Sequence, residues 1–251
     1  MKKSFVQCLA VVTFMLSAVL VIHAQGDTSK TPSASTANGA APMITATTPP
    51  IDLARAALAA QGGEKFKSLK SMVLKGSVDL YAPNSTQSIP GSFVMVTAGE
   101  KVRIEISAPP AINFKQIFDG QQSYSSIPNV QLPPASKFGP IVLTRLDQPG
   151  YAVTAIPDKK KLRGFRVTDG DGNVTDFYID PTNGRIMSFL IPYGGYTFGT
   201  ENKKFKDVEG VLVASSFTQR LEMPQGAFFA DYSVKDIKLN QPIGDDVFAI
   251  P

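Results

Sequence analysis

The chain has 251 residues and a formal net charge of +4, from 25 Lys and Arg against 21 Asp and Glu, a balance that does not indicate a nucleic-acid partner. Its only Cys and its only His, Cys8 and His23, both lie within the first 24 residues. If that segment is removed during export, the mature chain has no Cys/His zinc site, no His- or Cys-based catalysis and no disulfide, so its stability comes from its core.

Residues 1–24 are typical of a secretory signal peptide. Lys2 and Lys3 precede an apolar stretch over 5–22, and Ala24 places a small residue before the cleavage point. An uncleaved membrane anchor is the alternative, although the early lysines and the small residue favour cleavage. Residues 25–50 are rich in Ser, Thr, Ala and Pro and predict a flexible leader, because they cannot bury enough apolar surface to fold.

Order is expected to begin at Ile51. Residues 51–63 have apolar side chains at helical spacing and end in two glycines, which predicts a short helix. Beyond it the apolar period becomes two, most clearly over 101–107. Such alternation indicates antiparallel strands with one dry and one solvated face. We expect ten or so strands, at 71–81, 93–97, 101–107, 114–118, 151–156, 164–169, 174–179, 185–191, 211–222 and 228–239.

Two segments depart from this regular pattern. Residues 133–150 contain several prolines and apolar residues, and predict either a short helix or an irregular apolar flap. In the last strand the apolar residues are even-numbered as far as Val234 and odd-numbered from Ile237. This phase slip predicts a β-bulge, which bends a strand and curls its sheet. Phe248 is then expected to fold back and plug the interior.

The candidate catalytic and metal-binding motifs are weak. Residues 169–173, DGDGN, resemble part of a calcium loop, but the later ligands and flanking helices are missing, so a hairpin turn is the better interpretation. Asp245 and Asp246 are adjacent and point apart in an extended chain, which favours a solvated turn over an acid/base pair. A glycosidase with two carboxylates is not excluded by composition, but the chain has no Trp. We predict no catalytic residue, metal or cofactor.

The dry face of the sheet is the remaining candidate site. A bent sheet with one or two helices has more apolar wall than those helices can cover, which indicates a hydrophobic cavity or a second layer. For each single wall residue, a place in an ordinary core remains the alternative.

Three segments carry a resemblance to a known family: 57–80 (ALAAQGGEKFKSLKSMVLKGSVDL), 174–191 (VTDFYIDPTNGRIMSFLI) and 229–251 (FADYSVKDIKLNQPIGDDVFAIP). They resemble the LolA/LolB-like superfamily of periplasmic lipoprotein carriers and outer-membrane lipoprotein receptors, over about residues 51–251. The resemblance implies a mainly β (α+β) domain: an incomplete antiparallel β-barrel of about ten or eleven strands, with a helical lid and a cavity for acyl chains. It also implies periplasmic localisation.

The resulting hypothesis is a monomeric, non-enzymatic envelope protein that binds a lipid or the acyl chains of a lipoprotein, in lipoprotein sorting or lipid transport. Membrane-bound envelope proteins are further expected partners. The alternative is a structural or partner-docking β-module with a filled core. The residues expected to line the cavity are Met72, Leu74, Val78, Phe93, Val102, Ile104, Ile106, Phe177, Phe189, Tyr232 and Val234, and those expected in the lid are Leu53, Leu58, Ile141 and Leu143.

Overall fold

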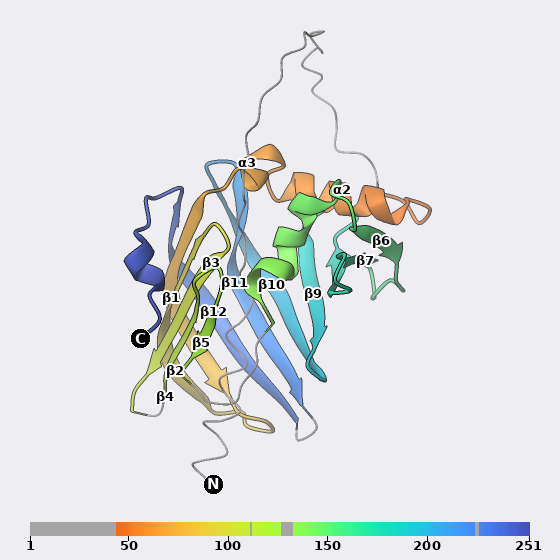
Figure 1. Cartoon of the computed structure of the whole chain (residues 1–251). Coiled ribbons are helices and arrows are strands. Elements are labelled where there is room, and N and C mark those ends of the chain that lie inside the picture. The colour runs from red at the N-terminus through yellow and green to blue at the C-terminus, as the bar shows by residue number, and fades with distance from the viewer. Residues whose placement is uncertain (1–43, 111, 127–132, 224–225) are drawn as a thin grey trace, which may run out of the picture.

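The computed structural model describes residues 44–110, 112–126, 133–223 and 226–251. Its strands form a single antiparallel sheet in the order β5-β4-β3-β2-β1-β12-β11-β10-β9-β8-β7-β6, with open edges at β5 and β6 (Figure 1). The strands are β1 (Ser71–Tyr81), β2 (Ser88–Ala98), β3 (Lys101–Ala108), β4 (Ile112–Phe118), β5 (Ser123–Ser125), β6 (Ala152–Ala155), β7 (Arg163–Thr168), β8 (Val174–Ile179), β9 (Ile186–Tyr193), β10 (Tyr196–Val208), β11 (Val211–Met223) and β12 (Gly226–Leu239).

The chain path explains where the helical segments lie. It runs from β1 to β5 at one edge, crosses to β6 at the other edge, and returns strand by strand to β12, which pairs with β1. The crossing connection contains two 3-10 helices, η2 (Ala135–Lys137) and η3 (Gly139–Arg145). The helices α2 (Pro50–Ala60) and α3 (Glu64–Lys67) lie across one end of the sheet, and η3, in green, lies below α2 in front of the strands (Figure 1). The predicted incomplete barrel with a helical lid is confirmed.

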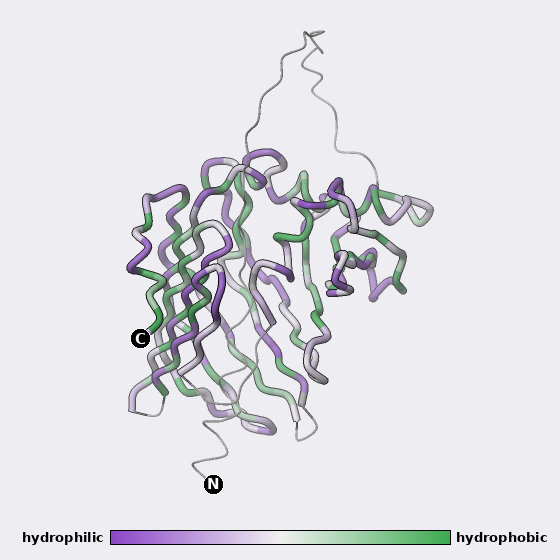
Figure 2. Tube along the Cα trace, in the orientation of Figure 1, coloured by the Kyte–Doolittle hydropathy of each residue, from purple (hydrophilic) through white to green (hydrophobic). Residues whose placement is uncertain are grey.

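Alternation decides which side chains face inward. On β3, Val102, Ile104 and Ile106 are at most 4% exposed, whereas the residues between them are partly exposed. Figure 2 shows the same alternation of hydrophobic and hydrophilic residues along the strands. The inward residues of the strands join those of α2 and η3 in one apolar cluster, which is the core of the protein.

Two strands were not expected from the sequence pattern, β5 and β10. β5 has three residues, too few to show a period. β10 has 13 residues, but its second half, 201–207, is mostly charged and hides the alternation. It is held in the sheet by β11, to which it pairs from Thr197 to Val208 with two register shifts. Backbone pairing between neighbouring strands therefore overrides the weak local pattern.

The predicted bulge in the last strand is confirmed. Lys75 of β1 pairs with Asp236, while the next residue, Gly76, pairs with Val234, so that Lys235 is the extra residue of β12. The two strands approach closely here: a Cβ atom on Gly76 would lie 2.0 Å from the carbonyl oxygen of Ser233. Glycine is therefore required opposite the bulge, and the bulge bends the sheet between its two halves.

The prediction for Phe248 is wrong. This residue does not plug the interior: it lies in η4 (Asp245–Phe248) and packs against Val73, Val96 and Ile117, which point to the outer face of β1, β2 and β4. The last turn is fixed there by the Arg103 guanidinium, which donates a hydrogen bond of 2.6 Å to the carbonyl oxygen of Val247. The physical reason is that these strands carry apolar residues on both faces, so the outer face also requires a cover.

The predicted signal peptide, residues 1–24, lies outside the described residues, as does the predicted leader up to residue 43. The last residues of that leader form a turn beside the sheet, where the Arg163 guanidinium donates a hydrogen bond of 3.1 Å to the carbonyl oxygen of Ala46. Within the described part of the chain, no helix combines the length and the apolar character needed to cross a membrane.

Candidate functional site

The concave face of the sheet brings together all fifteen residues predicted for the wall and the lid. Each is at most 9% exposed, and all belong to one apolar cluster. The wall residues come from β1, β2, β3, β8, β9 and β12, and the lid residues from α2 and η3. The sequence pattern therefore identified which side chains share this face; their contact with a ligand remains a prediction.

Aromatic rings form much of one half of the wall. Phe165, Phe177 and Phe189 follow one another across β7, β8 and β9, with ring centroids 5.1 and 6.1 Å apart. Nearer the bulge, Tyr232 stacks on Phe217 at 4.7 Å. Burial raises the pKa of Tyr232, so its hydroxyl stays neutral at physiological pH. Phe165 and Phe217 were not among the predicted site residues, although the alternation in their strands places them on this face.

The η3 part of the lid contacts the sheet through polar groups near its two ends and through buried apolar side chains between them. At its start, the backbone N–H of Gly139 donates a hydrogen bond of 3.2 Å to Thr175 Oγ1 on β8. At its end, Arg145 Nη2 donates a hydrogen bond of 3.3 Å to Glu100 Oε1 in the β2–β3 turn. Between these ends, Ile141 and Leu143 are buried in the apolar cluster. The lid thus spans the concave face from β8 to the opposite half of the sheet.

A small cavity of about 50 Å³ opens between this lid, the helical end of the domain and the sheet. Sites for drug-sized ligands measure roughly 300–1,000 Å³, so a cavity of this size does not hold an acyl chain. In this conformation side chains of the protein itself fill the concave face. Admission of a chain requires the lid to move. The cavity is lined by Gln61, Phe66, Met72, Pro140, Phe189, Asn202, Val211, Leu212, Val213 and Ala214.

Among the described residues, five buried side-chain polar atoms have no hydrogen-bond partner. Four are oxygens on the inner face and its rim, Gln61 Oε1, Thr97 Oγ1, Gln116 Oε1 and Thr200 Oγ1, which we call the four interior oxygens, and the fifth is Arg163 Nη1 on β7. The side chains of Thr97 and Gln116 point inward because their strand neighbours Val96 and Ile117 belong to the outer cluster. These polar positions were missed in the sequence, where a Thr or Gln in a strand looks like a solvated residue.

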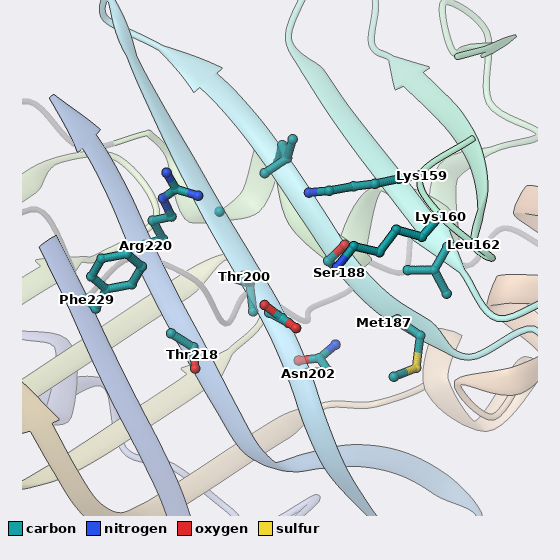
Figure 3. Close-up of a pocket in the computed structure, with 13 residues that line it drawn as sticks. Lys159, Lys160, Leu162, Met187, Ser188, Thr200, Asn202, Thr218, Arg220 and Phe229 are labelled. Atoms are coloured by element: carbon teal, nitrogen blue, oxygen red, sulfur yellow. The ribbon is translucent and has the colours of Figure 1, made fainter. Parts of the chain in front are cut away.

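A second hollow of about 300 Å³ lies on the outer face of β9, β10 and β11, under the loop that contains Lys159 and Lys160 (Figure 3). Two of the three cations that line it have partners: Lys159 lies 5.5 Å from the ring centroid of Tyr178, and Arg220 lies 5.6 Å from that of Phe229 and 2.6 Å from Glu222. No predicted site residue lines this groove, which we interpret as solvated surface.

The two weak motifs of the sequence take part in turns. The Asp169 carboxylate accepts hydrogen bonds from the backbone N–H groups of Asp171 and Asn173 and thereby closes the β7–β8 hairpin. Asp245 is exposed and forms an ion pair of 2.7 Å with Lys101. Within the described residues, no group of three or more His, Cys, Asp or Glu side chains is arranged to hold a metal ion.

Comparison with known proteins identifies the fold. The sequence matches no protein-family model and no curated protein. A LolA superfamily protein from Nitrosomonas europaea has a similar structure, with a TM-score of 0.54 and 11% identity over 81% of this chain and 99% of that chain. A putative outer membrane lipoprotein-sorting protein domain from Vibrio parahaemolyticus matches with a TM-score of 0.45 and 10% identity, over 79% and 95% of the two chains. A DUF1329 family protein from Desulfovibrio piger matches with a TM-score of 0.47 and 8% identity, over 80% and 98%.

The similarity to the Nitrosomonas protein shows that this chain has a LolA-like fold. The resemblance inferred from the sequence is therefore confirmed at the level of the fold.

Proposed function

We propose that this protein is a non-enzymatic, periplasmic envelope protein that binds an acyl chain of a lipid or lipoprotein between the lid and the concave face of its sheet. The main observation behind this proposal is the kind of segment that covers the apolar wall. The apolar wall is closed by the helix α2 and by a short connecting segment that is hydrogen-bonded to the sheet near its two ends, and not by a second sheet. The LolA-like fold supports the same interpretation. Lipoprotein sorting or lipid transport, with membrane-bound envelope partners, is the process we infer.

In such binding, contacts between the acyl chain and the wall replace the contacts between the lid side chains and the wall. Ile141 and Leu143 cover the wall in the described conformation. An acyl chain that replaces them gains roughly 0.8 kcal/mol for each methylene transferred from water. A chain of a dozen or more carbons thus offsets the loss of two lid side chains, and few directional contacts are needed.

The test compares one introduced charge on the two faces of β3. Ile104→Glu places a carboxylate on the wall, and Ser107→Glu places the same group on the exposed outer face of the same strand. Binding of a fluorescent acyl probe with an uncharged glyceryl head is measured by titration, with circular dichroism as the check on folding. We expect Ile104→Glu to abolish binding and Ser107→Glu to retain it.

Two results would contradict the proposal: no saturable binding of the probe by the wild-type protein, or equal binding by both variants. If Ile104→Glu does not fold, Ile104→Phe takes its place, since it adds apolar volume to the wall without a charge.

A partner-docking β-module is the second candidate function. It is favoured by the cavity of only about 50 Å³, which is what a permanently filled core would show. Native mass spectrometry of the purified protein separates the two candidates. Co-purifying lipid supports the carrier, whereas a lipid-free mass together with no acyl-probe binding supports the module.

A further inference from the structure

The four interior oxygens are costly to leave as they are. Thr97 is 1% exposed, Thr200 2%, Gln116 7% and Gln61 8%, so solvent does not replace the missing partners. Buried polar atoms in proteins are nearly always hydrogen-bonded, and each exception requires an explanation. Hydrophobic residues at these positions would serve a permanently closed core better.

The chemistry of these atoms restricts what can satisfy them. All four are oxygens with lone pairs, so a ligand group that carries an N–H or O–H donor complements them. The Thr97 and Thr200 hydroxyls both donate and accept, whereas the Gln61 and Gln116 amide oxygens only accept. A carboxylate accepts a hydrogen bond from a threonine hydroxyl, but it has no donor for an amide oxygen and places negative charge beside that oxygen's lone pairs.

The buried side chains also disfavour a charged ligand group. Among the described residues classed as buried, every polar side chain is an amide or a hydroxyl, and none is charged. Of the two partly buried arginines near the lid and the leader, Arg145 pairs with Glu100 at 3.3 Å and Arg163 with Asp158 at 3.1 Å. Arg163 Nη1 is buried without a partner among the described residues, but Arg163 lies on β7, which is distant in the sheet order from the strands of Thr97 and Gln116. A carboxylate buried beside Thr97 and Gln116 would therefore lack a counter-charge, which is strongly unfavourable.

Strand register places two of these oxygens within the predicted wall. Gln116 of β4 pairs with Ile104, which in turn pairs with Met95. Thr97 of β2 pairs with Val102, two residues along β3 from Ile104. A ligand that contacts Ile104 therefore lies beside both Thr97 and Gln116.

We propose that the ligand is an acyl chain joined to an uncharged polar group with an N–H or O–H donor, an acyl amide or a hydroxylated glyceride, and that Thr97 and Gln116 select this group over a free carboxylate. This inference rests on the proposed function, because it presupposes that a chain occupies the concave face. Thr97 and Gln116 are specificity-determining residues, and the apolar wall provides the affinity.

The experiment uses two probes of equal chain length, hexadecanoic acid and its primary amide, which compete with the fluorescent glyceryl probe at pH 7.5. We expect the amide to displace the probe at a concentration at least about tenfold lower than the acid, since desolvating an unpaired carboxylate is costly. The preference should shrink as the pH falls toward the pKa of the acid, because the protonated acid is uncharged and carries an O–H donor.

Two variants test the assigned residues. Thr97→Val and Gln116→Leu remove one interior oxygen each, and Thr218→Val removes a hydroxyl from the outer face, where Thr218 is hydrogen-bonded to Asp231. We expect both inner variants to raise the melting temperature and to reduce the preference for the amide severalfold. Thr218→Val should leave that preference unchanged. If Thr97 and Gln116 had only a structural role, their substitution would change the melting temperature without reducing the preference for the amide.

The outcomes are distinguishable. If neither competitor nor the glyceryl probe binds, the proposed function fails. If the probe binds and the acid competes as well as the amide, the proposed function stands and the neutral-ligand inference is overturned. If the amide is preferred but both inner variants keep the full preference, the assignment of Thr97 and Gln116 is overturned.

Discussion

The inner and outer apolar faces of the sheet are both covered by a helical segment, but the two covers differ in completeness. On the outer face, η4 packs Phe248 against Val73, Val96 and Ile117, and none of the partnerless buried oxygens in the described residues belongs to that cluster. On the inner face, the wall also includes Thr97 and Gln116, whose side-chain oxygens have no partner among the described residues. Under the proposed function, the inner cover is the one that a ligand displaces, whereas the outer cover stays in place.

The largest expected effect concerns the outer cover. Phe248 is 1% exposed, so Phe248→Ala removes a buried ring and should lower the free energy of unfolding by about 3–5 kcal/mol. Chemical denaturation measures this loss, and acyl-probe binding should persist under native conditions because the ring lies on the other face. Val247→Ala, in the same turn but only partly buried, is the matched control. A loss below 1 kcal/mol for Phe248→Ala would show that the outer cover is replaceable too.

The bend that separates the two halves of the sheet depends on Gly76. Gly76→Ala forces a Cβ atom toward the carbonyl oxygen of Ser233, and this overpacking should destabilise the protein by about 1–3 kcal/mol. Gly170→Ala is the control, since the nearest atom to its added Cβ lies at an ordinary 3.7 Å. Thermal unfolding compares the two variants. Equal melting temperatures would mean that the bulge adapts to a side chain.

The lid contact at Glu100 should affect kinetics more than stability. Glu100→Gln weakens the ion pair with Arg145, in which Glu100 is 39% exposed, and an exposed pair contributes at most about 1 kcal/mol. If this pair holds the lid closed, stopped-flow mixing should show a faster association of the acyl probe. Glu222→Gln breaks a comparable pair with Arg220 on the outer face and should leave the rate unchanged. If the association rate rises in both variants, or in neither, the Arg145–Glu100 pair does not control the opening of the lid.

The smallest expected effect is a pH dependence at the start of the lid. A hydrogen bond from Lys137, and then its charge, lower the pKa of the Asp171 carboxyl below its ordinary value of 3.8. Because the folded-state pKa is depressed, the contact is fully present above pH 3.8 and is lost as the pH falls through the lower, folded-state value. The hydrogen-exchange protection of residues 135–139, which is the intrinsic exchange rate relative to the measured rate at the same pH, should therefore be unchanged between pH 7 and 5 and lower near pH 3. Lys137→Met should show low protection at all three values, and protection that survives in this variant would contradict the role of the pair.

Strands were predicted well from the sequence where apolar and polar residues alternate without interruption. β3 and β8 were predicted closely, because Val102, Ile104 and Ile106, or Thr175, Phe177 and Ile179, alternate without interruption. The phase slip after Val234 likewise gave the bulge. β10 was missed because the charges between Glu201 and Asp207 conceal its alternation, and its pairing with β9 and β11 makes it a strand.

The sequence by itself determined that the domain is a bent antiparallel sheet with one continuous apolar face, because side-chain period and phase are local properties of the chain. Only the tertiary structure decided what covers each face. Phe248 lies outside because Val73, Val96 and Ile117, distant in sequence, come together there when the strands pair. The interior oxygens of Thr97 and Gln116 are likewise a consequence of strand register and lid position, since burial depends on contacts between distant segments that no local pattern encodes.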